Sequence, residues 1–140
     1  MAKNAKFVSK ALGMKIHSFL KYGLIISVLL AIFSFATYKS DAIVGKWESP
    51  DKDRRIEVYK KDNFYFGKII WQKPDKFRAE VGDIVIRDIE YQNPHWEGKI
   101  WVPEIKSDFT ANISLPTHNE LRVEATNGFI KKVKVWNRVK

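Results

Sequence analysis

From Ile43 onward, apolar and polar residues alternate with a period of two, and this pattern constrains the fold more than any other feature. It is clearest where Phe109, Ala111, Ile113 and Leu115 are separated by small polar residues. A period of two is typical of antiparallel strands with one buried face and one wet face. The predicted strands are Ile43–Glu48, Arg55–Tyr59, Phe64–Trp71, Asp83–Glu90, Trp96–Val102, Phe109–Leu115, Glu120–Ala125 and Lys131–Val139.

Turn-forming residues separate these strands, as in Ser49-Pro50-Asp51, Asn93-Pro94 and Asn127-Gly128. No gap is long enough for more than a turn of helix. Short strands at a spacing of about 8–12 residues predict an all-β domain, either a sandwich or an up-and-down barrel. We place this domain at residues 42–140. The chain has no Cys, so its core must hold the fold without disulfides.

The preceding residues, 1–41, contain the apolar run Leu24–Ala36, which carries no charge. Lysines and no acidic residues precede the run, which is the pattern of a secretory signal peptide. The alternative is an uncleaved N-terminal membrane anchor, because Tyr22–Tyr38 spans 17 residues and a spanning helix needs about 20. Either reading predicts an N-terminal hydrophobic helix.

Both readings put the lysine-rich end in the cytoplasm and the C-terminal domain across the membrane. The domain is therefore expected to be exported, either periplasmic or anchored to the membrane and facing the periplasm or exterior. Signal peptidase could cut at Ser34-Phe35-Ala36 or at Ser40-Asp41-Ala42, and Met14 offers a second start.

The charge distribution argues against a nucleic-acid binder. The net charge is +9, but residues 1–40 hold six Lys and no acid. The rest of the chain has 19 basic against 16 acidic residues, which is only mildly basic. We expect no nucleic-acid partner.

No catalytic or metal-binding set stands out. His17, His95 and His118 lie far apart in the sequence, and a zinc site needs three or four ligands. A nucleophile paired with a His needs a third, orienting group. We therefore expect no enzyme activity, no catalytic residues, no metal and no cofactor.

Several motifs fall in order along the domain. Val44-Gly45-Lys46-Trp47 opens the first strand, and Phe66-Gly67-Lys68-Ile69-Ile70-Trp71 lies in the third. Gly98-Lys99-Ile100-Trp101-Val102-Pro103-Glu104 follows, with Phe109-Thr110-Ala111 after it, and Trp136-Asn137-Arg138 ends the domain. Over roughly residues 43–140 the chain resembles a bacterial family of small exported proteins, domain of unknown function 2147. Members look like calycins, the lipocalin-like barrels.

The resemblance implies an antiparallel up-and-down barrel of about eight strands. In lipocalin-like barrels a first-strand Trp closes one end, and an Arg or Lys from the last strand lies across it. Trp47 and Arg138 would take these structural parts, in a cation–π contact of about 0.5–2 kcal/mol. Gly45 would let the backbone pass close to that Trp.

The aromatic residues give the best functional lead. Phe66, Trp96, Ile100, Phe109 and Ile113 occupy candidate inner faces of three strands, and we name them as candidate ligand-binding residues. An eight-stranded barrel is wide enough either to be filled by side chains or to hold one small ligand.

Two functions follow. The first is an exported calycin-like barrel that binds a small apolar ligand or a cell-envelope component. The second is a structural or interaction protein of the envelope with a filled core and an envelope protein as its partner. The membrane would be a further partner through the N-terminal segment if it is uncleaved.

Basic dipeptides lie near the ends of strands, at Arg54-Arg55, Lys60-Lys61 and Lys131-Lys132. They indicate either solvated charge that protects sheet edges from aggregation or contacts with anionic headgroups or cell-wall polymer.

Overall fold

The computed structural model describes residues 19–31 and 39–140, and the chain divides into two units after Lys39. In the first unit residues 19–31 form a helix, which confirms the predicted N-terminal hydrophobic helix. Among the described residues, no helix has the length and apolar character needed to cross a membrane. The rest of the Leu24–Ala36 run, with the cleavage site at Ser34–Ala36, lies outside the described residues, as do Met14 and His17.

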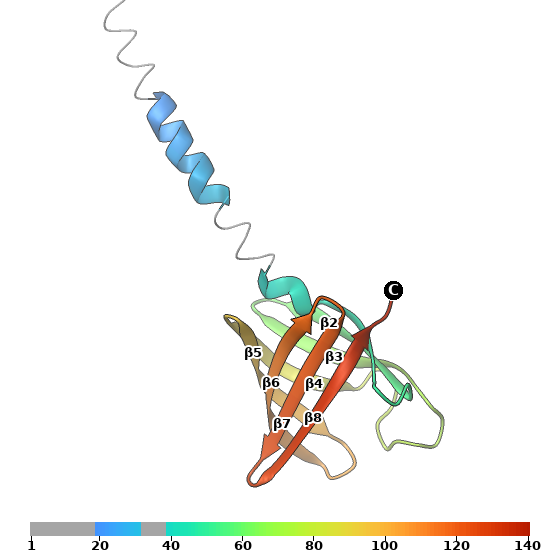
Figure 1. The fold of residues 1–140 in the computed structure, drawn as a ribbon. Helices are drawn as coiled ribbons and strands as arrows, with labels where there is room; N and C mark the ends of the chain where they lie inside the picture. The colour runs from blue at the N-terminus through green and yellow to red at the C-terminus, as the bar shows by residue number, and fades with distance from the viewer. Residues whose placement is uncertain (1–18, 32–38) are drawn as a thin grey trace, which may run out of the picture. The chain divides into compact units, whose positions relative to one another are not determined.

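The second unit begins at Ser40, slightly before the predicted boundary, and is an all-antiparallel closed barrel. Each strand pairs with its neighbours in the sequence, as the coloured arrows of Figure 1 show. This confirms the predicted eight-stranded up-and-down barrel. The short 3-10 helix η1, Asp41–Ile43, precedes β1 (Gly45–Glu48), β2 (Arg54–Lys61), β3 (Phe64–Gln72), β4 (Ile84–Gln92), β5 (His95–Val102), β6 (Ser107–Thr117), β7 (Glu120–Asn127) and β8 (Ile130–Arg138).

The turns between strands form where the sequence places residues that tolerate a left-handed backbone. Asp62 has φ 56° between β2 and β3, and Gly128 has φ 58° between β7 and β8. Asp and Gly adopt this conformation at low cost, so both hairpins are encoded locally.

The core lies inside the barrel and is built from alternate residues of the strands. It includes the large, fully buried side chains of Trp47, Tyr65, Ile69, Ile89 and Leu121. Ile43 of η1 joins the same core, so the segment before β1 is part of the folded domain.

The barrel closes through a short junction between β1 and β8. Only two residue pairs form it, Trp47 with Arg138 and Glu48 with Asn137. β8, in contrast, pairs with β7 along its whole length. Most of β8 therefore has a strand on one side only.

Candidate functional site

Four of the five candidate ligand-binding residues come together on the inner faces of β5 and β6. Trp96 lies opposite Ile113, and Ile100 lies opposite Phe109. Trp96, Phe109 and Ile113 are buried, and Ile100 packs against the core. The alternation of apolar and polar residues in β5 and β6 therefore predicted correctly which side chains point inward.

Phe66, the fifth candidate, lies on the opposite face of β3 from the one expected. Tyr65, Gly67 and Ile69 are the buried residues of this strand, and Phe66 is half-buried. Its ring stacks on Tyr59 of β2, with 5.9 Å between ring centroids. The expected inward direction of Phe66 is therefore wrong, because apolar residues occupy both faces of β3 and the period of two cannot choose between them.

The barrel interior is tightly packed around the four grouped residues. A Cβ atom on Gly67 would lie 2.9 Å from Cβ of Ile86, and one on Gly98 would lie 2.6 Å from Cδ1 of Ile89. The indole of Trp96 is fixed by a 2.9 Å hydrogen bond from Nε1 to the backbone oxygen of Ser40. At positions 67 and 98 a side chain would displace its neighbours, so the inner faces of β3, β4 and β5 pack closely there.

One end of the barrel, which we call the closed end, is organised by Arg138 and Trp47. The guanidinium carbon of Arg138 lies 4.1 Å from the ring centroid of Trp47. Its nitrogens donate hydrogen bonds to three backbone oxygens, those of Ala42, Val44 and His118, at 2.8–3.0 Å. The Trp47 indole in turn donates to the oxygen of Ile43 at 2.9 Å.

Gly45 makes room for this arrangement. Its φ is +143°, a conformation that residues with a side chain rarely adopt, and a Cβ there would lie 2.6 Å from Nη1 of Arg138. The two constraints together explain why a glycine stands two residues before Trp47.

A polar cluster at the same end joins η1 to the barrel wall. The carboxylate of Asp41 accepts hydrogen bonds from Lys60 Nζ at 2.8 Å and from Tyr65 Oη at 2.6 Å. Burial alone would raise the pKa of Asp41, but these hydrogen bonds and the charge of Lys60 hold it below its ordinary value. Burial and the hydrogen bond to Asp41 raise the pKa of Tyr65. These groups fasten η1 in place and show no nucleophile–base geometry.

A second polar cluster fixes the loops at the other end. Asp53 is 4% exposed, accepts a 2.7 Å hydrogen bond from Ser49 and pairs with Lys76 of the β3–β4 loop. Burial would raise the pKa of Asp53, but the hydrogen bonds from Lys76 and Ser49 lower it. Nearby, Arg54 stacks on the Phe77 ring at 3.9 Å. This cluster holds the β3–β4 loop against the barrel.

In the part of the chain that the structure describes, no three His, Cys, Asp or Glu residues gather as metal ligands. His95 contacts Glu97 on the outer wall, and His118 offers its backbone oxygen to Arg138.

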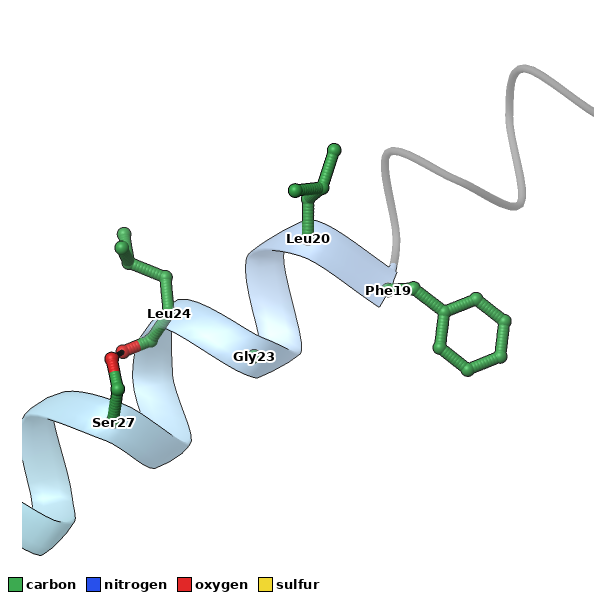
Figure 2. A pocket seen from close by; sticks show the side chains of 5 residues that line it. All are labelled: Phe19, Leu20, Gly23, Leu24 and Ser27. Atoms are coloured by element: carbon green, nitrogen blue, oxygen red, sulfur yellow. Dashed lines mark hydrogen bonds between the residues drawn. The ribbon is translucent and has the colours of Figure 1, made fainter.

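The helix of residues 19–31 carries a shallow hollow lined by Phe19, Leu20, Gly23, Leu24 and Ser27. Figure 2 shows Phe19 and Leu20 projecting away from this helix, and Ser27 bonds back to the oxygen of Leu24 at 2.8 Å. A single helix forms the hollow, so it cannot enclose a ligand.

The hairpin of β7 and β8 carries four exposed apolar side chains. Phe129 at its turn is fully exposed, and Ile130, Val133 and Val135 of β8 are also exposed. The sequence predicted a turn at Asn127-Gly128, a strand at Lys131–Val139 and the basic pair Lys131-Lys132, but not the exposed edge of this strand. The one signal was the alternation of Lys and Val from Lys132 to Val135.

Comparison with protein-family models matches residues 45–138 to the family described as uncharacterized protein conserved in bacteria, DUF2147. The chain belongs to this family. Membership confirms the resemblance that the ordered motifs suggested, and the match spans β1 to β8 of this DUF2147 chain. No match was found among curated proteins or solved structures.

Proposed function

We propose that this DUF2147 barrel is an exported interaction protein of the cell envelope, and that it contacts an envelope protein through its β7–β8 hairpin. The observation that supports the proposal is that the candidate ligand-binding side chains inside the barrel are buried, whereas apolar side chains on the β7–β8 hairpin are exposed. Trp96, Phe109 and Ile113 are packed and buried, whereas Phe129 and Val133 are uncovered.

Exposed apolar side chains in one place mark interaction surfaces, because isolated exposed apolar residues are common and clusters are not. Phe129 lies at the turn of this hairpin, and Val133 and Val135 lie together on the outer face of β8, whereas Ile130 lies on the inner face beside the turn. The basic, acid-free residues 1–40 and the Leu24–Ala36 run support export, as argued from the sequence.

The calycin-like alternative, a small apolar ligand held beside Trp96, Ile100, Phe109 and Ile113, would require these packed side chains to move apart. Phe66 would have to act from the outer wall. The packing favours the interaction protein.

Photo-crosslinking in the native cell tests the proposal. A benzophenone-bearing phenylalanine replaces Phe129 in the full chain, and a matched chain carries it at Phe64, an exposed phenylalanine of the β2–β3 hairpin. We expect a discrete protein adduct from position 129 that position 64 does not give.

Titration of the purified protein with a fluorescent fatty acid gives the opposing result. Saturable binding that Trp96→Ala or Phe109→Ala weakens without unfolding, together with no adduct at position 129, would favour the ligand-binding function instead.

A further inference from the structure

The backbone of β8 presents unpaired hydrogen-bonding groups between its junction with β1 and its turn. The N–H of Arg138 donates to Asn119 on the β7 side, whereas the N–H of Val139 donates to Lys46 on the β1 side, both at 2.9 Å. Successive residues of a strand direct their backbone groups to opposite sides. Lys131, Val133 and Val135 therefore direct theirs away from β7.

β1 ends before it can cover these groups. Its register with β8 stops at Glu48 opposite Asn137. Continued by two residues, it would place Pro50 opposite Val135, but Pro has no N–H to donate, and the Ser49-Pro50-Asp51 turn leads into β2. Within residues 39–140 no strand pairs with 131–135 on this side. We call these five residues the β8 edge.

From Lys132 to Val135 the side chains of the β8 edge alternate between lysine and valine as they alternate in direction. Lys132 and Lys134 lie opposite Ala125 and Val123 of β7, which puts them on the inner face, yet both are exposed. Val133 and Val135 lie on the outer face. A strand added here would meet Lys132 and Lys134 along one face. Along the other face it would meet Val133 and Val135, with Lys131, which pairs with Glu124, next to them.

The described carboxylates leave much of this positive charge unpaired. Lys131 pairs with Glu124 at 2.6 Å, and Lys134 reaches Asp51 only at 3.9 Å. Lys132 has no carboxylate partner in the part of the chain that the structure describes. The edge therefore favours negative charge in whatever covers it.

We propose that the β8 edge binds an extended segment of another protein in which acidic residues alternate with apolar ones. The segment adds as a strand beside β8, its acidic residues next to Lys132 and Lys134 and its apolar residues next to Val133 and Val135. Strand addition supplies affinity through main-chain hydrogen bonds and specificity through alternate side chains. This inference rests on the proposed function and names the chemistry of its partner.

A second copy of the chain is the less favoured occupant. Two β8 edges paired antiparallel about Val133 would bring Lys132 of each copy opposite Lys134 of the other. Like charges opposite each other in a sheet are destabilising, and lysines on an edge normally prevent such pairing.

The test combines the adduct from position 129 with two variants of the edge. Val133→Pro removes one edge N–H and no hydrogen bond to β7, and Val133→Thr, which keeps the N–H and the β-branched shape, is its control. Lys132→Glu combined with Lys134→Glu reverses the charge, with the exposed Lys99→Glu of β5 as control. Thermal melting of each full-length variant verifies that it is folded.

We expect Val133→Pro and the charge reversal each to lower the yield of adduct about tenfold, and the controls to leave it unchanged. Mass spectrometry of the adduct should identify a segment with alternating acidic residues. If the protein with an unaltered β8 edge gives no adduct from position 129, the proposed function itself is overturned. An adduct whose yield is unchanged in both edge variants would overturn the binding of an acidic strand, although contact with a partner through the hairpin would remain supported. An adduct formed by two copies of this chain would also overturn the acidic strand.

Discussion

Arg138 connects parts of the chain that lie far apart in the sequence. Its guanidinium stacks on Trp47 and donates to backbone oxygens before β1 and between β6 and β7. Burial lowers its pKa, but an arginine remains charged at neutral pH. A planar group with donors fixed in a fork suits this place, because it can stack and bond to several carbonyls at once.

Trp47→Ala should lower the free energy of unfolding by about 3–5 kcal/mol, as truncation of a large buried aromatic does. Arg138→Ala should cost less. The two losses should be non-additive by about 0.5–2 kcal/mol, because the side chains contact each other. Urea melts of both single variants and the double variant measure the coupling. Strictly additive losses would contradict an energetic role for the cation–π contact.

The sequence allowed the Trp47–Arg138 contact to be expected, since the Gly-x-Trp motif and the final Arg resemble those of known barrels. It did not indicate what the guanidinium nitrogens bond. Backbone carbonyls carry no signal in the sequence, so the bonds to Ala42, Val44 and His118 could only come from the three-dimensional arrangement.

At the scale of elements, η1 covers the closed end of the barrel and is held there by core packing and by polar contacts. Ile43 enters the core, and Asp41 is bonded to Lys60 and Tyr65. Both hydrogen bonds are stronger when the Asp41 carboxylate is ionised.

Because the folded protein holds the pKa of Asp41 below its ordinary value, Asp41 stabilises the fold above about pH 4, and this contribution disappears as the pH falls through the lowered pKa. Asp41→Asn should reduce stability at pH 7 by about 1 kcal/mol, a modest value because the side chain is 37% exposed and screened by water. The difference from the unaltered protein should vanish in acid. Melts between pH 2 and pH 7 check this, with the exposed Asp108→Asn as control. A difference that stays constant with pH would mean that the charge of Asp41 is not what matters.

Strands differ in how well the sequence predicted their faces. β6 alternates cleanly, and its buried residues Phe109, Ala111 and Ile113 could be named in advance. In β3, by contrast, apolar residues lie on both faces, with Phe64 and Phe66 on one and Tyr65 and Ile69 on the other, so the sequence pattern does not show which face is buried. Which face of β3 is buried depends on its register with β4. Gly67 lies opposite Ile86, and a side chain at position 67 would collide with Ile86. That contact between strands is invisible in the β3 sequence alone.

At the scale of the whole molecule, the start of the barrel unit bears on how the chain would be processed. Ser40 and Asp41 contact Trp96 and Tyr65, so they belong to the folded unit. Cleavage after Ala42 would remove both residues, whereas cleavage after Ala36 would keep them.

We therefore predict that the domain is exported and that, if the leader is removed, the cut follows Ala36. A reporter that is active only in the periplasm is fused after Lys140, and the intact mass of the exported chain is measured. A matched fusion that begins at Ala42 should remain inactive. A full-length fusion that is produced but stays inactive would contradict export, and a mature chain starting at Ile43 would contradict the assigned cut.

The number of strands and their order could be predicted because neighbouring strands are joined by short turns that the sequence encodes. The short junction between β1 and β8 could not, because it depends on where two strands at opposite ends of the domain stop pairing. Pro50 is the local cause, but a Pro in a predicted turn does not reveal which strand edge it leaves open.

The pairing of sequential strands also sets an order of events during folding. Seven of the eight strand pairings join neighbours in the chain, so each hairpin can form with little loss of loop entropy. Only the meeting of β1 with β8 joins residues about ninety positions apart, through two residue pairs. Contacts between such distant positions are the slow ones. We therefore expect the strands from β1 to β8 to form an open, curved meander first, and the barrel to close only when Arg138 of β8 meets Trp47 of β1.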